Sequence, residues 1–327
     1  MKKFGKILLV CIVVIVPIAI TFTIGWRPFL GPKKRATTNV QFERTPERVA
    51  RGKYLVQGIL NCEVCHSPKD WTQHGGPSIP GKELAGQVLP MPGLPGTIVA
   101  PNLTPDPQTG SANWTDDQIA RAIREGVKHD GSTIFPMMPY RAYRDLSDED
   151  LAAVVVYLRS LTPVSNPLPP SQVKFPVNYL VRSAPEPVTQ PVPAPASDPV
   201  SRGKYLVKLG CGCHNASETV QLGGGENLVG PWGNVTSANI TSDPSGISYY
   251  SEAGFIAVLR TGFVGARRLN SIMPFEGFKN LSDDDLKAIF AYLRTVPPVK
   301  HRVDNSLPAT YCKVCKQKHG GGDQNKI

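Results

Sequence analysis

Apolar residues recur every three or four positions along three stretches of the chain, residues 116–127, 148–158 and 283–293. This spacing places them on one face of a helix. Each stretch begins after a Ser or Thr that has a Gln or Asp three residues further on, which is typical of a helix N-terminus. These starting pairs are Thr115 with Gln118, Ser147 with Asp150, and Ser282 with Asp285. There is no convincing alternation of apolar and polar residues around them, so the pattern predicts loop-rich helical modules with modest cores.

Part of this pattern belongs to an internal repeat. The hexapeptide RGKYLV at residues 51–56 returns at residues 202–207, at an offset of 151 residues. Three further pairs share an offset of 135 residues: Met138-Pro139-Tyr140 with Met273-Pro274-Phe275, Leu146-Ser147-Asp148 with Leu281-Ser282-Asp283, and Tyr157-Leu158-Arg159 with Tyr292-Leu293-Arg294. The repeat predicts two copies of one module, residues 42–162 and 201–300, and the second copy is shorter in its middle.

The segments between and after the modules differ from them in composition. Residues 163–200 contain 11 prolines in 38 positions. Because proline cannot donate to a helix or a sheet ladder, we expect an extended, fairly stiff linker here. Residues 301–327 are polar and Gly-rich, which predicts a flexible basic tail.

The N-terminal segment predicts a membrane anchor. Residues 7–26 carry no charge and follow lysines at positions 2, 3 and 6. About 20 such residues can cross a bilayer as a helix, so a transmembrane anchor is expected over residues 1–27. A cleaved signal peptide is the alternative, although the apolar run is long for one.

The net charge of +10 is concentrated at the two ends of the chain. Residues 1–41 contain seven basic and no acidic residues, and residues 301–327 have an excess of three basic residues. Nucleic acid is therefore not an expected partner, because its binding needs a concentrated basic surface on a folded domain.

Cys62-Glu63-Val64-Cys65-His66 is the sharpest chemical motif in the chain. Two cysteines at this spacing can form thioethers to the two vinyl groups of one haem, and the adjacent histidine then lies beneath the iron as an axial ligand. A zinc site would need two more ligands nearby, and a thioredoxin-like pair would need a βαβ setting. The sequence around the motif offers neither, so c-type haem attachment is predicted.

A haem iron that shuttles electrons needs a sixth ligand, and a methionine sulphur opposite histidine raises its reduction potential. Met137 and Met138 both precede the capped helix at 148–158, but only Met138 has a counterpart in the repeat, Met273. We therefore expect Met138 to be the ligand in the first module and Met273 in the second. The alternative is that these methionines only fill a core.

The second module carries a shortened motif, Gly210-Cys211-Gly212-Cys213-His214, with one residue between its cysteines. Gly210 stands where the first cysteine would be. The main expectation is a single thioether at Cys213 with His214 as ligand, because the short loop would strain a second thioether at Cys211. A module that has lost its haem is the alternative, although Met273 and the surrounding repeat are retained.

A third cysteine pair, Cys312 and Cys315, lies in the tail and precedes Lys316. A third haem is not expected there, because no helical module surrounds the pair and lysine is ordinarily protonated. A local disulfide or a free dithiol is the main expectation for an oxidising compartment. A metal site that includes His319 is a further alternative.

These motifs resemble class I cytochromes c, and more narrowly the multihaem cytochrome c subunits of membrane-bound alcohol and gluconate dehydrogenases. The matching stretches are 51–66, 102–106, 114–127 and 138–158, and more loosely 202–214 and 239–293, together about two-thirds of the chain. Together with the helical patterns and the N-terminal apolar run, the resemblance leads us to expect an all-α fold, with two cytochrome c-like helical domains in tandem behind an N-terminal transmembrane helix. It implies three thioether cysteines and two pairs of axial ligands: Cys62, Cys65 and Cys213, His66 with Met138, and His214 with Met273.

The expected function is that of a membrane-anchored dihaem cytochrome c, single-pass in the cytoplasmic membrane with its haem domains on the periplasmic side. It would pass single electrons from a quinol or a dehydrogenase to a terminal oxidase or a soluble cytochrome of the respiratory chain. The layout is also similar to the cytochrome subunit of cbb3-type oxidases. The enzyme alternative is a dihaem peroxidase or thiosulfate-oxidising enzyme with an open haem in the second module. A haem-based sensor or structural subunit with a dead second copy is the third alternative.

Overall fold

Helices form the frame of the molecule, and the described strands are two to four residues long. The computed structural model describes residues 2–215 and 220–326, with side chains described from residue 11. The first module contains α3 (Pro46–Gln57), α4 (Glu63–His66), β1 (Gln87–Val88), β2 (Gly96–Thr97), β3 (Val99–Ala100), α5 (Asp116–Glu125), α6 (Tyr140–Tyr143) and α7 (Asp148–Ser160). The second contains α9 (Pro199–Gly210), η2 (Gly212–His214), β5 (Asn227–Gly230), β6 (Gly233–Thr236), α10 (Glu252–Thr261), β7 (Phe263–Val264), β8 (Arg267–Arg268), α11 (Phe275–Phe278) and α12 (Asp283–Thr295).

The remaining elements lie before, between and after the modules: α1 (Lys2–Thr23), α2 (Arg27–Leu30), β4 (Gln172–Val173), α8 (Val177–Leu180), η1 (Val181–Ser183), β9 (Ala309–Tyr311), β10 (Lys318–Gly320) and η3 (Gly322–Lys326). The strands pair antiparallel in five two-stranded sheets: β1 with β3, β2 with β4, β5 with β6, β7 with β8, and β9 with β10. Each sheet is too small to form a layer of its own, and the long helices carry the core.

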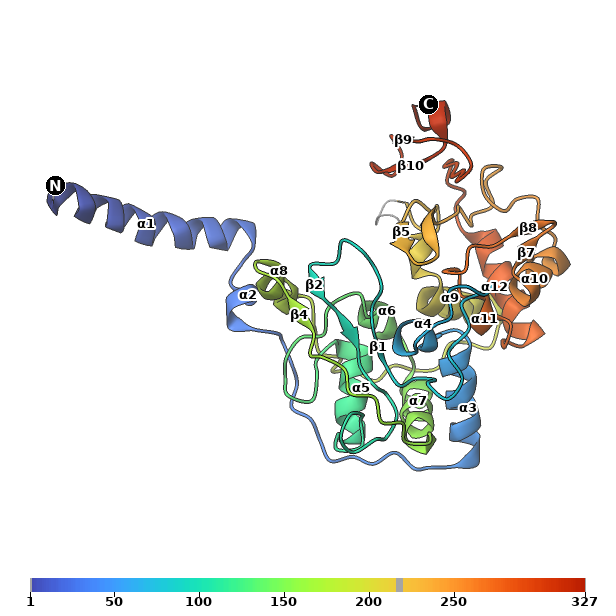
Figure 1. Ribbon diagram of the computed structural model, residues 1–327, viewed down its shortest axis with the longest axis horizontal. Coiled ribbons are helices and arrows are strands. Elements are labelled where there is room, and N and C mark those ends of the chain that lie inside the picture. Colours follow the sequence, from blue (N-terminus) through green and yellow to red (C-terminus); the bar gives the residue numbers. More distant parts are fainter. Residues whose placement is uncertain (1, 216–219, 327) are drawn as a thin grey trace.

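The first and last long helices of each module pack across one another, α3 on α7 and α9 on α12 (Figure 1). Gly52 of α3 faces the carbonyl oxygen of Ala153, and Gly203 of α9 faces that of Ala288. A side chain at either glycine would overlap the oxygen, so the close crossing requires glycine. The same crossing explains why the hexapeptide at 51–56 recurs at 202–207.

The predicted helix starts are confirmed. Thr115 accepts a hydrogen bond from the backbone N–H of Gln118, whose side chain reciprocates in a capping box. Ser147 and Ser282 cap α7 and α12 in the same way, each accepting the N–H of the residue three positions later. These caps satisfy N–H groups that have no partner inside the helix.

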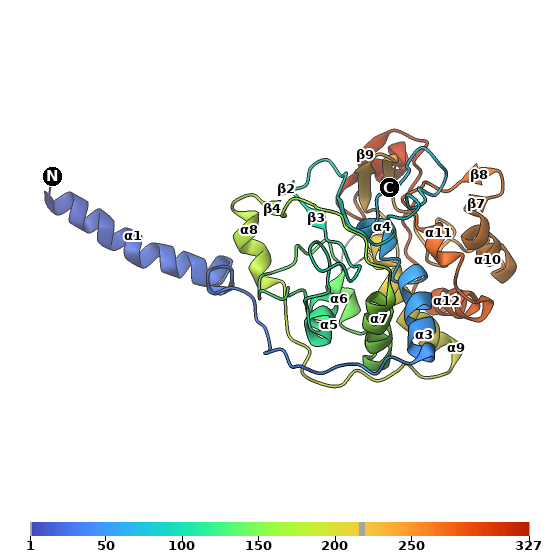
Figure 2. The same cartoon turned by 60° about the horizontal axis from the view of Figure 1, so that its bottom comes forward.

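The two modules share one hydrophobic core and meet through a pair of matching contacts. The hydroxyl of Tyr54 donates to Asp285 across the interface at 2.6 Å, and that of Tyr205 donates to Asp150 at 2.7 Å. Each aspartate also accepts two hydrogen bonds from an arginine of its own module, Arg51 on Asp150 and Arg202 on Asp285. The interface therefore has an approximate twofold symmetry that follows from the repeat. Figure 2 shows α3, α7, α9 and α12 gathered at this junction.

The Pro-rich segment runs back along the first module. Its strand β4 pairs with β2, and Figure 1 shows β4 and α8 beside that strand. Further on, Asp148 and Val192 exchange hydrogen bonds of 2.9 and 3.0 Å through the Asp148 N–H and carboxylate. The composition indicated an extended segment, but the sequence did not show that this module binds it.

The prediction of a membrane-spanning anchor over residues 1–27 is wrong. In the described part of the chain, no helix combines the length and the apolar character that crossing a membrane requires. The single-pass localisation that followed from this helix is wrong for the same reason.

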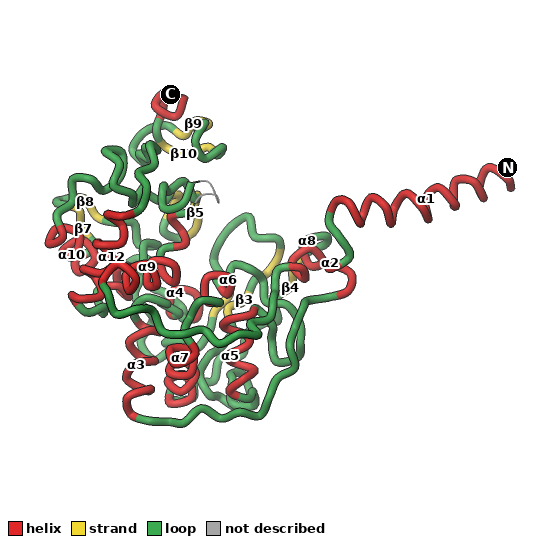
Figure 3. The backbone as a smooth tube through the Cα atoms, turned by 180° about the vertical axis from the view of Figure 1, so that it is seen from behind, coloured by secondary structure: helices red, strands yellow, loops and turns green. Residues whose placement is uncertain are grey.

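Residues 301–326 are folded onto the second module, where the sequence predicted a flexible tail. Strands β9 and β10 form a hairpin, which Figure 3 shows next to β5. Asn305 ties this segment to β6, because its side chain accepts the Thr236 N–H at 2.8 Å and donates to the Thr236 carbonyl at 2.9 Å. Side-chain and backbone hydrogen bonds hold the segment. Because these contacts need no periodic apolar residues, the sequence pattern did not indicate that the segment is folded.

Candidate functional site

The Cys62–His66 motif forms a single helical turn directly after α3. The His66 N–H donates to the Cys62 carbonyl at 2.9 Å, so the cysteines and the histidine lie around one turn. His66 is buried, and its Nδ1 lies 2.7 Å from the carbonyl oxygen of Pro101. A carbonyl can only accept, so Nδ1 carries the proton and Nε2 presents a lone pair. Burial lowers the pKa of His66, which keeps the imidazole in its neutral, ligating form.

The second module reproduces this arrangement on a tighter turn. Residues Gly212–His214 form a 3-10 turn instead of an α-turn, which fits the missing residue between the cysteines. His214 is buried, its Nδ1 lies 2.7 Å from the carbonyl oxygen of Ala238, and burial lowers its pKa. Its Nε2 is therefore also a lone-pair donor, so both modules orient a neutral imidazole in the same way.

The cysteines of both motifs are poor candidates for a thiol–disulfide redox centre. Burial raises the pKa of Cys62 to about 12 and that of Cys65 to about 11. Burial likewise raises the pKa of Cys211 to about 12 and also raises that of Cys213. A redox-active pair needs a thiolate stabilised at neutral pH, and these environments disfavour the thiolate.

Met138 and Met273 occupy equivalent places beside the shared core. Both are partly buried against the hydrophobic cluster, and each stands one proline before a short helix, α6 or α11. In each case the carbonyl of the methionine accepts an N–H two residues later, from Tyr140 or Phe275, at 2.8 Å. The two thioethers are thus held by the same local turn, as the repeat predicts, and their role as iron ligands stays a prediction.

The two attachment motifs lie close together across the module boundary. Gly210 packs so closely on Ile59 that a side chain there would overlap the Ile59 side chain. Cys213 is near enough to Cys65 to contribute to the raised pKa of Cys65, after burial as the larger cause. The loop after the first motif also reaches the second module, where Trp71 meets Trp232 edge-on with ring centroids 4.8 Å apart. Groups attached at the two motifs would therefore be neighbours.

Two asparagines, which follow the same pattern in both modules, support the histidine loops. Asn102 accepts the N–H of Thr104 and donates to the Val164 carbonyl at 2.7 Å. Asn239 makes the corresponding contacts with Thr241 and Val299 in the second module. Each asparagine directly follows the residue whose carbonyl holds the histidine, so it fixes that carbonyl in place. The repeated Asn-(Leu/Ile)-Thr triplet was the available signal.

The residues of each site fit a covalently attached haem. Each offers cysteine thiols beside a histidine, a neutral imidazole with Nε2 as lone-pair donor, and a thioether beside an apolar core. These are the donor types that attach and ligate haem in c-type cytochromes.

Comparison with known proteins agrees with this donor set. Residues 49–162 match the family model described as Cytochrome c. The chain is 28% identical over 326 residues to the alcohol dehydrogenase (quinone), cytochrome c subunit, of Gluconacetobacter polyoxogenes, covering 84% of this chain and 66% of that protein. It is 33% identical over 281 residues to the gluconate 2-dehydrogenase cytochrome c subunit of Pantoea cypripedii, covering 76% and 59%.

A shorter relative matches over most of its own length. The chain is 28% identical over 259 residues to a diheme cytochrome c-type protein of Cereibacter sphaeroides, covering 73% of this chain and 83% of that protein. The chain thus spans less than two thirds of the two dehydrogenase subunits but most of the diheme protein.

Proposed function

Because this chain belongs to the cytochrome c family, we propose that it is a dihaem cytochrome that transfers single electrons within a dehydrogenase complex. One haem is attached at Cys62 and Cys65 and the other at Cys213. His66 with Met138 would hold the iron of the first haem, and His214 with Met273 that of the second. The single observation that carries the proposal is the matched pair of buried histidines, each with Nδ1 held 2.7 Å from a backbone carbonyl.

A haem with both axial positions filled supplies one-electron chemistry between Fe(III) and Fe(II). The protein contributes orientation and exclusion of water. The carbonyls of Pro101 and Ala238 fix the histidine tautomer, and burial keeps both imidazoles neutral. The methionine sulphurs would favour the reduced iron and so raise the potential of each site.

The junction between the modules supports electron transfer along the chain. The shared core and the crossed Tyr54–Asp285 and Tyr205–Asp150 hydrogen bonds hold the two attachment motifs in a fixed relation. A rigid relation keeps the distance between two redox groups constant, so no rearrangement is needed for each transfer.

The names of the relatives support a dehydrogenase as electron donor, and the acceptor is a further member of a respiratory chain. Relatives are named as subunits of alcohol and gluconate dehydrogenases, and these proteins are longer than the matched part of this chain. The partner and its substrate class are therefore part of the proposal.

The haem content of the purified full-length protein tests the proposal. Two haems per chain that resist extraction by acidified acetone are expected, and carbon monoxide or cyanide should not bind promptly to either. His66→Ala and His214→Ala should each alter the optical spectrum of one haem, whereas His129→Ala, at an exposed histidine, should alter neither. Extractable porphyrin or a single haem would contradict the dihaem assignment, and prompt ligand binding at one haem would favour an enzyme.

Purification with native partners tests the donor. Addition of an alcohol or of gluconate to the purified complex should reduce both haems, measured by their visible absorption bands. Reduction by quinol alone, with neither substrate effective, would argue against a dehydrogenase donor.

A further inference from the structure

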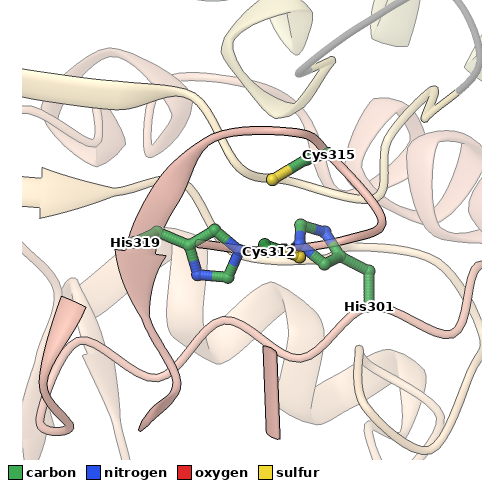
Figure 4. A group of neighbouring side chains, drawn as sticks. All are labelled: His301, Cys312, Cys315 and His319. Atoms are coloured by element: carbon green, nitrogen blue, oxygen red, sulfur yellow. Dashed lines mark hydrogen bonds between the residues drawn. The ribbon is translucent and has the colours of Figure 1, made fainter. Parts of the chain in front are cut away.

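Four buried side chains converge in the C-terminal segment, outside both candidate haem sites. His301 follows α12, Cys312 and Cys315 lie in the turn between β9 and β10, and His319 lies on β10. Their exposed fractions are between 1% and 5%, and their nitrogen and sulphur ligand atoms all lie within 4.8 Å of one another. Figure 4 shows the two imidazole rings side by side, with Cys312 and Cys315 next to them, and the ring planes are nearly perpendicular.

The histidine contacts indicate that a cation belongs between the rings. Nδ1 of His301 lies 2.7 Å from the Gly223 carbonyl, and Nδ1 of His319 lies 2.6 Å from the Gly320 carbonyl. Both Nδ1 atoms must therefore be donors, which leaves a lone pair on each Nε2. These two Nε2 atoms are 2.9 Å apart. Two facing acceptors repel, and a proton shared between them would place an isolated charge in a buried site.

The segment also lacks an apolar core that would explain its fold. Within residues 302–326, all of them described, the buried side chains other than glycine are Cys312, Cys315, His319 and Asn325. Asn325 serves the hairpin itself, since it donates to the carbonyls of Thr310 and His319. Short polar segments of this kind usually need a metal or a disulfide to fold.

We propose that His301, Cys312, Cys315 and His319 bind a structural zinc ion. Two thiolates and two imidazoles in a closed set of four are a donor set of structural zinc, with the two cysteines at the usual Cys-x-x-Cys spacing. Zinc replaces the two thiol protons, so its charge of +2 is balanced by two thiolates and the buried site is neutral. The Val314 N–H, 3.4 Å from Cys312 Sγ, adds a hydrogen bond to one thiolate. Tetrahedral binding would widen the Nε2–Nε2 distance to about 3.3 Å.

Two other uses of the cysteines agree less well with the geometry. A Cys312–Cys315 disulfide would consume both thiols and leave the two Nε2 lone pairs facing each other. A third haem would need room for a porphyrin beside the thiols, where the two imidazoles already lie within 4.8 Å. Lys316, which would have to replace the histidine of a haem motif, is exposed.

The zinc site is connected to the histidine loop of the second module. His301 donates through Nδ1 to Gly223, and the next residue, Gly224, donates its N–H to the His214 carbonyl at 2.8 Å. Asn239, which supports the same loop, also donates to the His301 carbonyl at 3.1 Å. Zinc therefore anchors the tail and braces the loop that holds His214. This inference does not depend on the haem proposal, because all four ligands lie outside both haem motifs.

The metal content of the full-length protein, purified without chelators, tests the site. Inductively coupled plasma mass spectrometry should find about one zinc per chain, and X-ray absorption at the zinc edge should find two sulphur and two nitrogen ligands. The double variant Cys312→Ser/Cys315→Ser should lose the zinc. His301→Asn should lose it too while keeping a side chain that can donate to Gly223, as Asn166 does to the corresponding loop of the first module.

His129→Asn is the matched control, because this histidine is exposed and outside the cluster, and its zinc content should stay at the wild-type value. The zinc-free variants should become susceptible to proteolysis within residues 302–326, while the first haem keeps its spectrum. Mass spectrometry after alkylation should find Cys312 and Cys315 as free thiols in denatured, chelated wild-type protein. A disulfide at 312–315, copper in place of zinc, a third haem, or zinc retained by the double variant would each overturn the assignment.

Discussion

The loop that carries the candidate axial histidine is braced by a different side chain in each module. In the first, the Asn166 amide donates to the carbonyls of Ala85 and Gly86 at 2.8 and 3.1 Å. In the second, His301 donates to the Gly223 carbonyl at 2.7 Å. The two side chains stand 135 residues apart, at the offset of the repeat, and their own N–H groups donate to equivalent hydroxyls.

This difference shows how one position of the repeat can make the same contact with the loop in both modules and make a further contact in the second. An asparagine side chain uses its amide to brace the loop and has no imidazole nitrogen to offer. An imidazole can brace the loop through Nδ1 and present Nε2 in the opposite direction. The second module thus retains the support for His214 while adding a ligand for the C-terminal cluster. The helix crossings at Gly52 and Gly203 stay the same because the core depends on them.

The largest expected effect concerns haem attachment, where the two motifs differ most. Cys213→Ala should reduce the covalent haem content from two per chain to one. Cys211→Ala should leave two, because the shortened turn is served by one thioether. Intact-mass spectrometry measures both. Loss of haem from the Cys211→Ala protein would show that the second motif uses both cysteines and would remove this contrast with the first.

Removal of an interface aspartate should have the next largest effect. Asp150→Ala and Asp285→Ala each leave an arginine of the same module and a tyrosine of the other without their acceptor. We expect a loss of about 2–3 kcal/mol in the free energy of unfolding, measured with urea; the arginines are partly exposed, so the lower end of the range for broken buried pairs applies. Asp284→Asn, on the exposed side of α12, is the control. Equal stability of all three proteins would contradict a structural role of the interface.

The Asp285 pair should also respond to pH. Burial alone would raise the pKa of Asp285, but hydrogen bonds from Arg202 and Tyr54 outweigh burial and lower it. A carboxyl whose pKa is lower in the folded protein stabilises it above the unfolded value of about 3.9, and this contribution disappears as the pH falls through the folded pKa. Unfolding of wild type and Asp285→Asn compared at neutral pH and near pH 3 should show their difference shrinking in acid. A difference that grows in acid would refute the pairing.

The tyrosine hydroxyls should contribute less than the aspartates. Tyr205→Phe should cost about 2 kcal/mol and Tyr54→Phe about 1 kcal/mol in unfolding free energy, since both donate to a carboxylate and Tyr205 is the more buried. Urea unfolding of the two variants measures the order. The reverse order would mean that the approximate twofold symmetry does not extend to the energetics of the two contacts.

The smallest expected effect is at the brace of the first module. Asn166→Ala removes two hydrogen bonds to the loop after His66 and should cost about 1 kcal/mol in unfolding free energy. Asn39→Ala, at an exposed asparagine, is the control. If Asn166→Ala left the unfolding free energy unchanged, the hydrogen bonds of Asn166 would resemble those of His301 in geometry but would not stabilise the module.

Local signals predicted the frame of the molecule well. The capping pairs at Thr115, Ser147 and Ser282 and the repeat fixed where the main helices begin and that they recur, because capping and helical periodicity act within a few residues. The match of residues 49–162 to the cytochrome c family model also agrees with the motifs. The ligand roles of His66 and Met138, and those of their counterparts, stay predictions.

Other sequence predictions failed for one of two reasons. Either contacts between distant residues determined the structure, or the prediction considered only one local property, such as polarity or the length of an apolar run. The apolar N-terminal run was interpreted from charge and length alone, and the described part of the chain contains no membrane-spanning helix. The tail was judged flexible from its polarity, yet its buried positions are ligating side chains instead of aliphatic ones. Sequence reasoning named His319 as a partner of the tail cysteines but missed His301, which lies before the hairpin.

By itself, the sequence determined where three of the main helices begin, their caps and the repeat, since each is encoded in neighbouring residues. Only the tertiary structure decided that the modules share one core through crossed Tyr–Asp contacts, that the linker lies along the first module, and that His301 meets Cys312, Cys315 and His319. Those contacts join residues from up to 231 positions apart. Their free energy depends on the packing of the whole chain, so a pattern within a few neighbouring residues cannot predict them.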